Sequence, residues 1–308
     1  MGKKLIITSI VLMAIATALI IKDRISEPPS SYINDNAAEI VEIIPEKDQK
    51  RSLQEVAATN VIKEINNKSD KIKSISCDRT IVHLWYQGLW YNGLNLKLKG
   101  NLYYEKPKNF HMTVNSLAGK EFIMGSNNEE FWFWSKRLHP SSLYHAKHED
   151  INKTRLKSAF NPLMVMDSLG INPLYYGVGV AVKEEGSKIF LVQKRVNSIG
   201  QPIGYITVVD KDEKRLIGHM VTDDDGVMIA SSEILEYKDG LPYKILYRWE
   251  EEDQVMLIEL PDAKINQKLS TDLWKRPDIK PQVNMGETKV DFKWNLEQED
   301  ELLQRSRD

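Results

Sequence analysis

Histidines and carboxylates gather in one short stretch of the sequence. His139, His145 and His148 lie close together and are followed by Glu149 and Asp150. Imidazole and carboxylate groups are ligands of Zn²⁺ in proteins, so the stretch is a candidate metal site. The run YHAKHED is typical of a strand, however, in which His145 and His148 point to opposite faces. We therefore predict no metal and interpret these residues as solvated polar side chains; a hydrolase using this cluster is the enzymatic alternative.

The remaining motifs do not assemble a catalytic or cofactor site. TDDDG, residues 222–226, lacks the spacing and the distal glutamate of a calcium loop, and it indicates a hairpin turn. GVGVAV, which starts at Gly177, lacks the third glycine and the following helix of a dinucleotide fold. Neither G-x-S-x-G nor a P-loop occurs, and Cys77 is predicted to be a small buried apolar residue. The sequence thus predicts a non-enzyme without a cofactor.

The beginning of the chain indicates a membrane segment. Leu5–Ile21 carries no charge and follows Lys3 and Lys4, as in a membrane anchor or a signal sequence. We favour an uncleaved, single-pass anchor in the inner membrane over cleavage at Ala16–Ala18, with residues 1–25 as this segment. The main domain then lies on the extracytoplasmic, periplasmic side. The residues expected in the membrane include Leu5, Ile6, Val11, Leu12, Leu19 and Ile20.

The composition of the whole sequence limits which classes of protein the chain can belong to. The protein has 308 residues, a formal net charge of −2 and one cysteine. A single cysteine excludes an intramolecular disulfide, and the near-neutral charge gives no signal for nucleic acid as a partner. Residues 26–49 read as a linker, because turn-forming residues occur there without a sustained period.

Hydrophobic periodicity predicts two helices and many strands. SLQEVAATNVIKEINN places Leu53, Ala57, Val61 and Ile65 on one stripe of a helix. NPLMVMDSLG indicates a second, short helix with Pro162 at its first position. Elsewhere apolar and polar residues alternate with a period of two, which predicts about eleven antiparallel strands. A single sheet with that many strands must curl or close into a barrel.

Two of the strands show which side chains share a face. In one strand Leu94, Leu96, Leu98, Leu102 and Tyr104 point one way, whereas Lys97 and Lys99 point the other. In EEFWFWSK, Phe131 and Phe133 point one way and Trp132 and Trp134 the other, so both faces of that strand need cover. The aromatic residues are either cavity lining or the core of a packed sheet.

Several segments resemble the LolA/LolB-type lipoprotein carriers. LKLKGNLYYEKPKNFHMTV is similar to their strand–proline–strand segment, FIMGSNNEEFWFWS to the following hairpin, and NPLMVMDSLG to their lid helix. The similarity covers about Gln49 to Leu273, with a half-barrel domain at 50–274 and a charged, disordered tail at 275–308. Glu105 and Lys106 stand where some carriers have an arginine, and a helical tether replaces the usual lipid anchor or free shuttle.

The resemblance implies a fold and a function. The fold is mainly β, an incomplete antiparallel barrel or curled sheet with an N-terminal helix and a short lid helix. Its apolar cavity would hold acyl chains of a lipoprotein or lipid, in lipoprotein or lipid transfer; a sensor that binds an envelope protein is the alternative on the same fold. The implied lid residues are Leu163, Met166 and Leu169. The implied cavity wall consists of Leu94, Leu96, Leu98, Leu102, Tyr104, Phe110, Met112, Val114, Phe131 and Phe133.

Overall fold

Long antiparallel strands make up most of the described chain. The computed structural model describes residues 53–86, 94–117, 119–154, 162–177, 179–196, 202–250, 254–288, 290 and 293–294. Its helices are α3 (Leu53–Ser69), η2 (His148–Lys153), α4 (Pro162–Ser168) and η4 (Thr271–Trp274). Its strands are β1 (Ser74–Tyr86), β2 (Leu94–Glu105), β3 (Asn109–Ser116), β4 (Gly119–Ser126), β5 (Glu130–Ser135), β6 (Leu138–His139), β7 (Leu143–Lys147), β8 (Val180–Glu185), β9 (Lys188–Val196), β10 (Pro202–Asp210), β11 (Arg215–Thr222), β12 (Met228–Lys238), β13 (Leu241–Trp249), β14 (Gln254–Glu259), β15 (Lys264–Ile265), β16 (Gln282–Asn284) and β17 (Lys293–Trp294).

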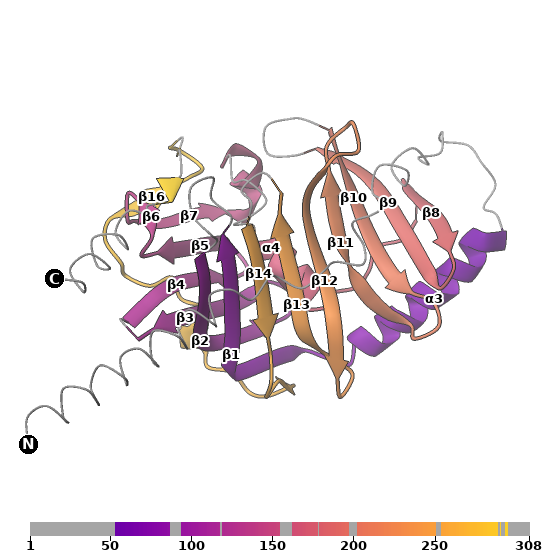
Figure 1. Cartoon of the computed structure of the whole chain (residues 1–308), viewed down its shortest axis with the longest axis horizontal. Helices are drawn as coiled ribbons and strands as arrows, with labels where there is room; N and C mark the ends of the chain where they lie inside the picture. The colour runs from indigo at the N-terminus through magenta and orange to yellow at the C-terminus, as the bar shows by residue number, and fades with distance from the viewer. Residues whose placement is uncertain are drawn as a thin grey trace, which may run out of the picture.

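All of these strands except β6 and β17, which pair with each other in a small separate sheet, form one open sheet that curls without closing into a barrel (Figure 1). The order is β16-β7-β5-β4-β3-β2-β1-β14-β13-β12-β11-β10-β9-β8, with β15 beside β1. All neighbours run antiparallel except the pair β16 and β7. The predicted mainly β, curled antiparallel fold is confirmed. The sheet has more strands than expected, partly because the GVGVAV stretch leads into β8.

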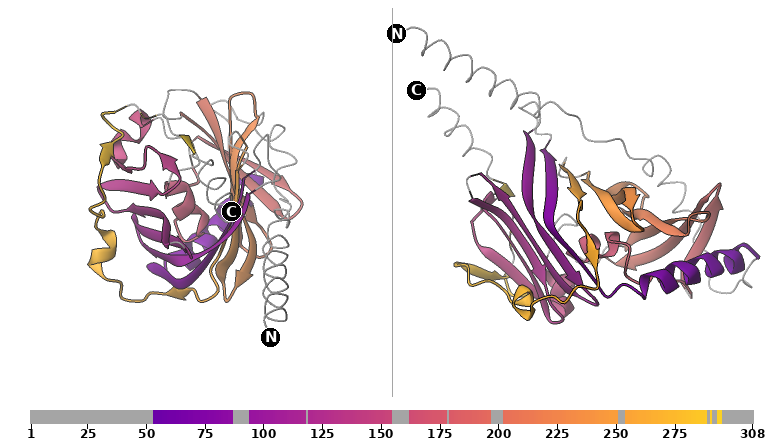
Figure 2. Two further views of the ribbon diagram at one scale, coloured as in Figure 1. Left: turned by 60° about the vertical axis from the view of Figure 1, so that its left-hand side comes forward. Right: turned by 90° about the horizontal axis from the view of Figure 1, so that it is seen from below.

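The connection between β7 and β8 joins the two ends of the sheet. Because β7 lies near one edge and β8 forms the other, the chain between them must cross the curved sheet. The short helix α4 lies in this crossover and packs against β12 and β4 on the concave face (Figure 2). Ser168 donates a hydrogen bond of 2.7 Å to Ser232 of β12, which attaches the end of α4 to the sheet. The predicted short helix is therefore present and covers the sheet.

The longer helix α3 adds to the same cover. Its buried residues include Ala58, Ile62 and Ile65, and Val61 packs against the same cluster, so Val61 and Ile65 of the predicted stripe face the core; the side chains of Leu53 and Ala57 lie outside the described residues. The side chain of Asn66 bonds to both the carbonyl and the amide of Leu174, at 3.0 and 2.8 Å. These bonds fix α3 to the loop that follows α4.

The chain after Trp274 is ordered as far as the structure describes it. Residues 275–288 run along the outer side of β3–β7, and β16 pairs in parallel with β7 (Figure 2). Arg276 forms an ion pair of 2.9 Å with Glu130, and Met285 is buried. The prediction of a disordered tail is wrong for 275–288, because backbone pairing and this ion pair offset its polar composition. Residues 295–308 lie outside the described residues.

The arrangement explains the aromatic strand β5. Phe131 and Phe133 belong to the concave apolar cluster, whereas Trp132 is fully buried on the opposite face. Trp132 lies flat across Gly125 of β4, where an added Cβ would come within 2.4 Å of the indole ring. The chain from η4 to β16 provides cover on this outer side. Both faces of the strand are thus buried by different parts of the protein.

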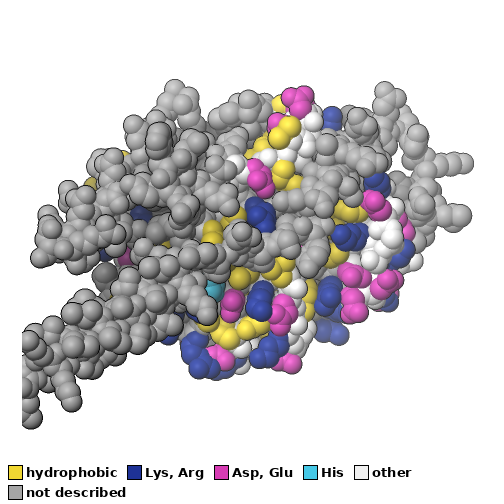
Figure 3. Space-filling model, in the orientation of Figure 1, with side chains coloured by type: hydrophobic (Ala, Val, Ile, Leu, Met, Phe, Trp, Pro, Cys, Tyr) yellow, Lys and Arg dark blue, Asp and Glu magenta, His cyan; other side chains and the backbone are white. Residues whose placement is uncertain are grey.

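Charges of both signs are interspersed on the described part of the outer surface (Figure 3). Some of them form ion pairs, such as Lys244 with Glu236 at 2.8 Å and Arg79 with Asp262. Such exposed pairs contribute little to stability. This mixture agrees with the near-neutral net charge of the sequence.

Candidate functional site

The predicted cavity wall and lid converge on the concave face. Leu98, Leu102, Tyr104, Phe110, Met112, Val114, Phe131 and Phe133 are each at most 5% exposed and join one apolar cluster with Met166 and Leu169 of the lid. Leu96 and Leu163 are partly buried and pack against this cluster. Lys97 and Lys99 are exposed on the other face, as the period-two pattern predicts. The side chain of Leu94 lies outside the described residues, and the role of the set as a cavity wall stays a prediction.

The concave cluster is rich in methionine. Methionine side chains are flexible and repack easily around an irregular neighbour. They come from the wall, from the lid, from strands β4 and β14 and, for Met285, from the segment after β16. The methionines of the cluster are Met112, Met124, Met164, Met166, Met256 and Met285.

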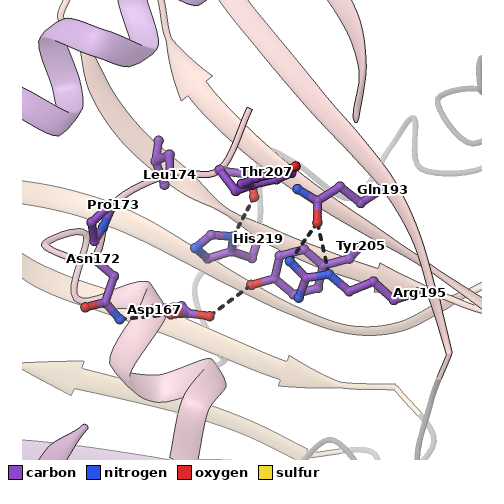
Figure 4. Close-up of a pocket in the computed structure, with 10 residues that line it drawn as sticks. Asp167, Asn172, Pro173, Leu174, Gln193, Arg195, Tyr205, Thr207 and His219 are labelled. Carbon is purple, nitrogen blue, oxygen red and sulfur yellow. Dashed lines mark hydrogen bonds between the residues drawn. The ribbon is translucent and has the colours of Figure 1, made fainter. Parts of the chain in front are cut away.

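A polar pocket that sequence reasoning missed lies beside the apolar cluster. Its volume is about 80 Å³, and it lies where the end of α4 and the following loop face β9, β10 and β11 (Figure 4). Its lining residues are Asp167, Asn172, Pro173, Leu174, Tyr175, Gln193, Arg195, Tyr205, Thr207 and His219.

Asp167 is the centre of a hydrogen-bond network in this pocket. Its carboxylate accepts a bond of 2.9 Å from Asn172 and one of 3.4 Å from the hydroxyl of Tyr205. Asn172 in turn accepts a hydrogen bond from the hydroxyl of Tyr104, a wall residue. Burial and the Asp167 charge raise the pKa of Tyr205 well above its ordinary value, so its phenol stays protonated. The network therefore connects the polar pocket to the apolar wall.

Arg195 supplies the positive charge of the pocket. Its guanidinium carbon lies 3.8 Å from the centre of the Tyr205 ring, a cation–π contact. Nε and Nη2 donate to the side-chain oxygen of Gln193 at 3.0 and 2.8 Å. Among the described residues, neither Arg195 nor Asp167 forms an ion pair. The pocket therefore presents two opposite charges around one tyrosine, with Asp167 at the hydroxyl end of Tyr205 and Arg195 over the face of its ring.

His219 closes the inner end of the pocket. It is 3% exposed, and its Nδ1 lies 3.1 Å from the hydroxyl of Thr207. Burial lowers the pKa of His219, against the opposing effect of Asp167, so the imidazole is neutral at pH 7. Its buried Nε2 forms no standard hydrogen bond in the described part of the chain, although the Asp167 backbone interacts with the ring. A buried polar atom of this kind costs free energy unless a ligand or water binds it.

Strand register explains why the pocket was missed. Gln193 faces Tyr205, and Thr207 faces His219, across neighbouring strands. Each of these polar residues interrupts an apolar strand face, which is the signal that the sequence does contain. Which of these polar residues become neighbours depends on the register in which the strands pair, and a single strand does not contain that information. Asp167 reaches them only because the connection between β7 and β8 crosses the sheet.

The histidine cluster is dispersed in the structure. His145 lies on β7, with its Nδ1 3.4 Å from Glu130, whereas His148 begins η2 and contacts the carbonyl of Asn127 at 2.7 Å. The expectation that YHAKHED is one strand is wrong at His148, where the extended backbone ends. Across the part of the chain that the structure describes, no group of three or more His, Cys, Asp or Glu side chains is placed to hold a metal ion.

Several solved structures share part of this arrangement with the chain at low sequence identity. A LolA superfamily protein from Nitrosomonas europaea is 10% identical, with a TM-score of 0.45 over 70% of this chain and 97% of its own. A putative outer membrane lipoprotein-sorting protein domain from Vibrio parahaemolyticus is 9% identical, with a TM-score of 0.46 over 72% and 95%. A DUF1329 family protein from Desulfovibrio piger is 9% identical, with a TM-score of 0.45 over 73% and 98%.

Sequence comparison adds no family assignment. No protein-family profile matches the chain, and no curated protein matches it in sequence. None of the helices within the described residues is long and apolar enough to cross a membrane. The predicted anchor, Leu5–Ile21, lies outside those residues.

Proposed function

We propose that this chain is a membrane-tethered, extracytoplasmic binding protein that holds acyl chains against its concave face during lipoprotein or lipid transfer. The observation that supports the proposal is the convergence of wall and lid residues on one methionine-rich apolar cluster. Each acyl CH₂ group that leaves water for such a surface gains about 0.8 kcal/mol. No catalytic step is part of the proposal.

The cover of the concave face suggests how an acyl chain enters. Helix α4 has seven residues, and it lies in a crossover rather than in the hydrogen-bonded sheet. Its end is held to the sheet by polar contacts, chiefly Ser168 with Ser232 and Asp167 with Tyr205. Movement of α4 would expose the apolar cluster without breaking any strand pair.

A photoactivatable acyl probe tests the proposal directly. The full chain in membrane vesicles is illuminated with a palmitate analogue that carries a diazirine, and labelled peptides are mapped by mass spectrometry. We expect labels at the concave side chains, for example Leu98, Met112 and Met166, and a decrease when unmodified palmitate competes. Leu98→Trp should reduce labelling, whereas Lys97→Trp, one residue away on the outer face, should not. Labels that fall mainly on the Lys97 face, or that palmitate does not displace, would overturn the proposal.

A second candidate function is a sensor or interaction module that binds an envelope protein. The very low exposure of the wall residues favours it, because a tightly packed concave cluster leaves no room for a ligand. In that case the acyl probe would label no specific site, and substitutions on the concave face would act through stability alone.

A further inference from the structure

We propose that the polar pocket at the end of α4 binds a zwitterion of the phosphoethanolamine type, with its ammonium group at Asp167 and its phosphate group at Arg195. The inference rests on the proposed function in one respect, namely that the zwitterion is the head group of the acylated ligand.

The first observation is a pair of opposite charges, the exposed Arg195 and the partly buried Asp167, neither of which forms an ion pair with a described residue. The Asp167 carboxylate lies at the hydroxyl end of Tyr205, and the Arg195 guanidinium lies over the face of the same ring (Figure 4). Because the ring separates them, the two groups line one cavity without forming an ion pair with each other. A ligand with an anion and a cation on a short link can pair with both groups, whereas a simple anion or cation pairs with only one of them.

The position of Asp167 points the same way. It lies in the last turn of α4, where the backbone carbonyl groups disfavour a negative charge. Its hydrogen bonds from Asn172 and Tyr205 are neutral, so they orient the carboxylate without cancelling its charge. A carboxylate held in this way is ready to accept an ammonium group.

The second observation is the buried His219, whose Nε2 forms no standard hydrogen bond in the described chain although the Asp167 backbone interacts with the ring. This side chain is 3% exposed and lines the pocket, and Thr207 occupies only its Nδ1. When the Thr207 hydroxyl donates to Nδ1, Nε2 carries the hydrogen and can donate it to a ligand oxygen. The pocket thus has a buried donor in addition to the guanidinium of Arg195.

The place of the pocket connects it to the acyl site. Tyr104 belongs to the predicted wall and donates a hydrogen bond to Asn172, which donates to Asp167. Leu174 lines the pocket and also packs against the apolar cluster. A ligand whose chain lies on the concave face therefore has its head group beside Asp167 and Arg195.

Within the described ranges, no neighbouring charged residue forms an ion pair with Asp167 or Arg195. Lys194 is exposed and follows Gln193 on β9, so it points to the other face of the sheet. Lys211 is already paired with Glu184, at 3.4 Å. Lys194 therefore provides a matched control for Arg195, and the exposed Asp224 in the β11–β12 turn provides one for Asp167.

Calorimetry of the full chain in a neutral maltoside detergent tests the pocket. The probes are glycerophosphoethanolamine, glycerol phosphate and ethanolamine. We expect the zwitterion to bind at least about tenfold more tightly than either half, because a charge-assisted hydrogen bond is lost with each omitted group. Asp167→Asn should reduce the affinity for glycerophosphoethanolamine to that for glycerol phosphate. Arg195→Gln should weaken both phosphate-containing probes, and Lys194→Gln and Asp224→Asn should change neither. Unaltered melting temperatures would show that the variants fold.

Either of two calorimetric results would overturn the inference. One is no preference for glycerophosphoethanolamine over its halves in the unaltered protein. The other is an Asp167→Asn variant that binds glycerophosphoethanolamine as well as the original chain does.

Vesicles and the acyl probe separate this inference from the proposed function. If the head group is the ligand, native mass spectrometry should detect phosphatidylethanolamine, in preference to phosphatidylglycerol, carried from vesicles by the full chain. Binding of glycerophosphoethanolamine without phosphatidylethanolamine would support the pocket but assign it a free soluble zwitterion. Acyl labelling without zwitterion binding would overturn the pocket assignment and leave the proposed function standing.

Discussion

Replacement of Leu98 distinguishes a ligand cavity from a packed core. Leu98 is 5% exposed and pairs across β2 and β1 with Val82, inside the concave cluster. Leu98→Ala removes three carbon atoms, which corresponds to roughly 2.4 kcal/mol at about 0.8 kcal/mol for each buried group. In a close-packed core the empty space left behind raises the total to about 2–5 kcal/mol. On a wall that already faces a cavity, little new empty space is created, so the loss should not exceed the transfer contribution of roughly 2.4 kcal/mol.

Leu98→Trp provides the complementary measurement. A tryptophan that enters a cavity occupies space without strain, whereas in a filled core it overpacks and destabilises by about 1–3 kcal/mol or more. Urea unfolding followed by fluorescence gives the free energy of unfolding of both variants. Affinity for a fluorescent acyl probe is measured in parallel, and Lys97→Trp on the outer face serves as the control.

The carrier proposal expects one combination of results. Leu98→Ala should lower stability little and weaken acyl binding, while Leu98→Trp should keep stability and abolish binding. If Leu98→Trp unfolds the protein, and if the original chain binds no acyl probe, the reasoning is refuted. The sensor or interaction module then becomes the better interpretation of the same fold.

Three further predictions follow from the lid, the aromatic strand and the membrane segment. Leu163→Glu combined with Met166→Glu should abolish acyl-probe binding while circular dichroism still reports the sheet, because two unpaired charges cannot remain buried under α4; binding at the original level would exclude α4 from the site. Gly125→Ala should lower the free energy of unfolding by about 1–3 kcal/mol, because the new methyl group meets the Trp132 ring; an unchanged urea midpoint would contradict this packing. An alkaline phosphatase fusion at Ser30 should be active, and an inactive fusion with an active cytoplasmic reporter would place the domain inside the cell.

The sequence predicts the repeating features of the fold well. Period-two alternation assigns Leu98, Leu102 and Tyr104 to one face of β2, and the structure buries them together. The pattern succeeds because each residue's face depends only on its own strand. The short helix is also recognisable, since Pro162 and the apolar residues after it lie within one local stretch.

Features that depend on distant partners were not predictable in this way. Residues 275–288 look polar and proline-rich, but their order comes from pairing with β7 and from the Glu130–Arg276 ion pair. The polar pocket likewise combines Asp167 with side chains from β9, β10 and β11, whose register no single segment contains. Isolated polar residues on apolar strand faces are the one local sign of such a pocket.

The pairing of β1 with β14 has a consequence for how this protein folds. Tyr86 pairs with Gln254, so the two halves of the sheet join through strands more than half the chain apart. Such non-local pairing slows folding, because a long loop must close before the contacts form. Until β14 is synthesised, strands β1–β5 can pair with one another, but the outer edge of β1 has no partner strand. Unpaired strand edges can form hydrogen bonds with strands of other chains. A chain that ends before β14 should therefore aggregate, and the emerging N-terminal half would need protection until its last long strand arrives.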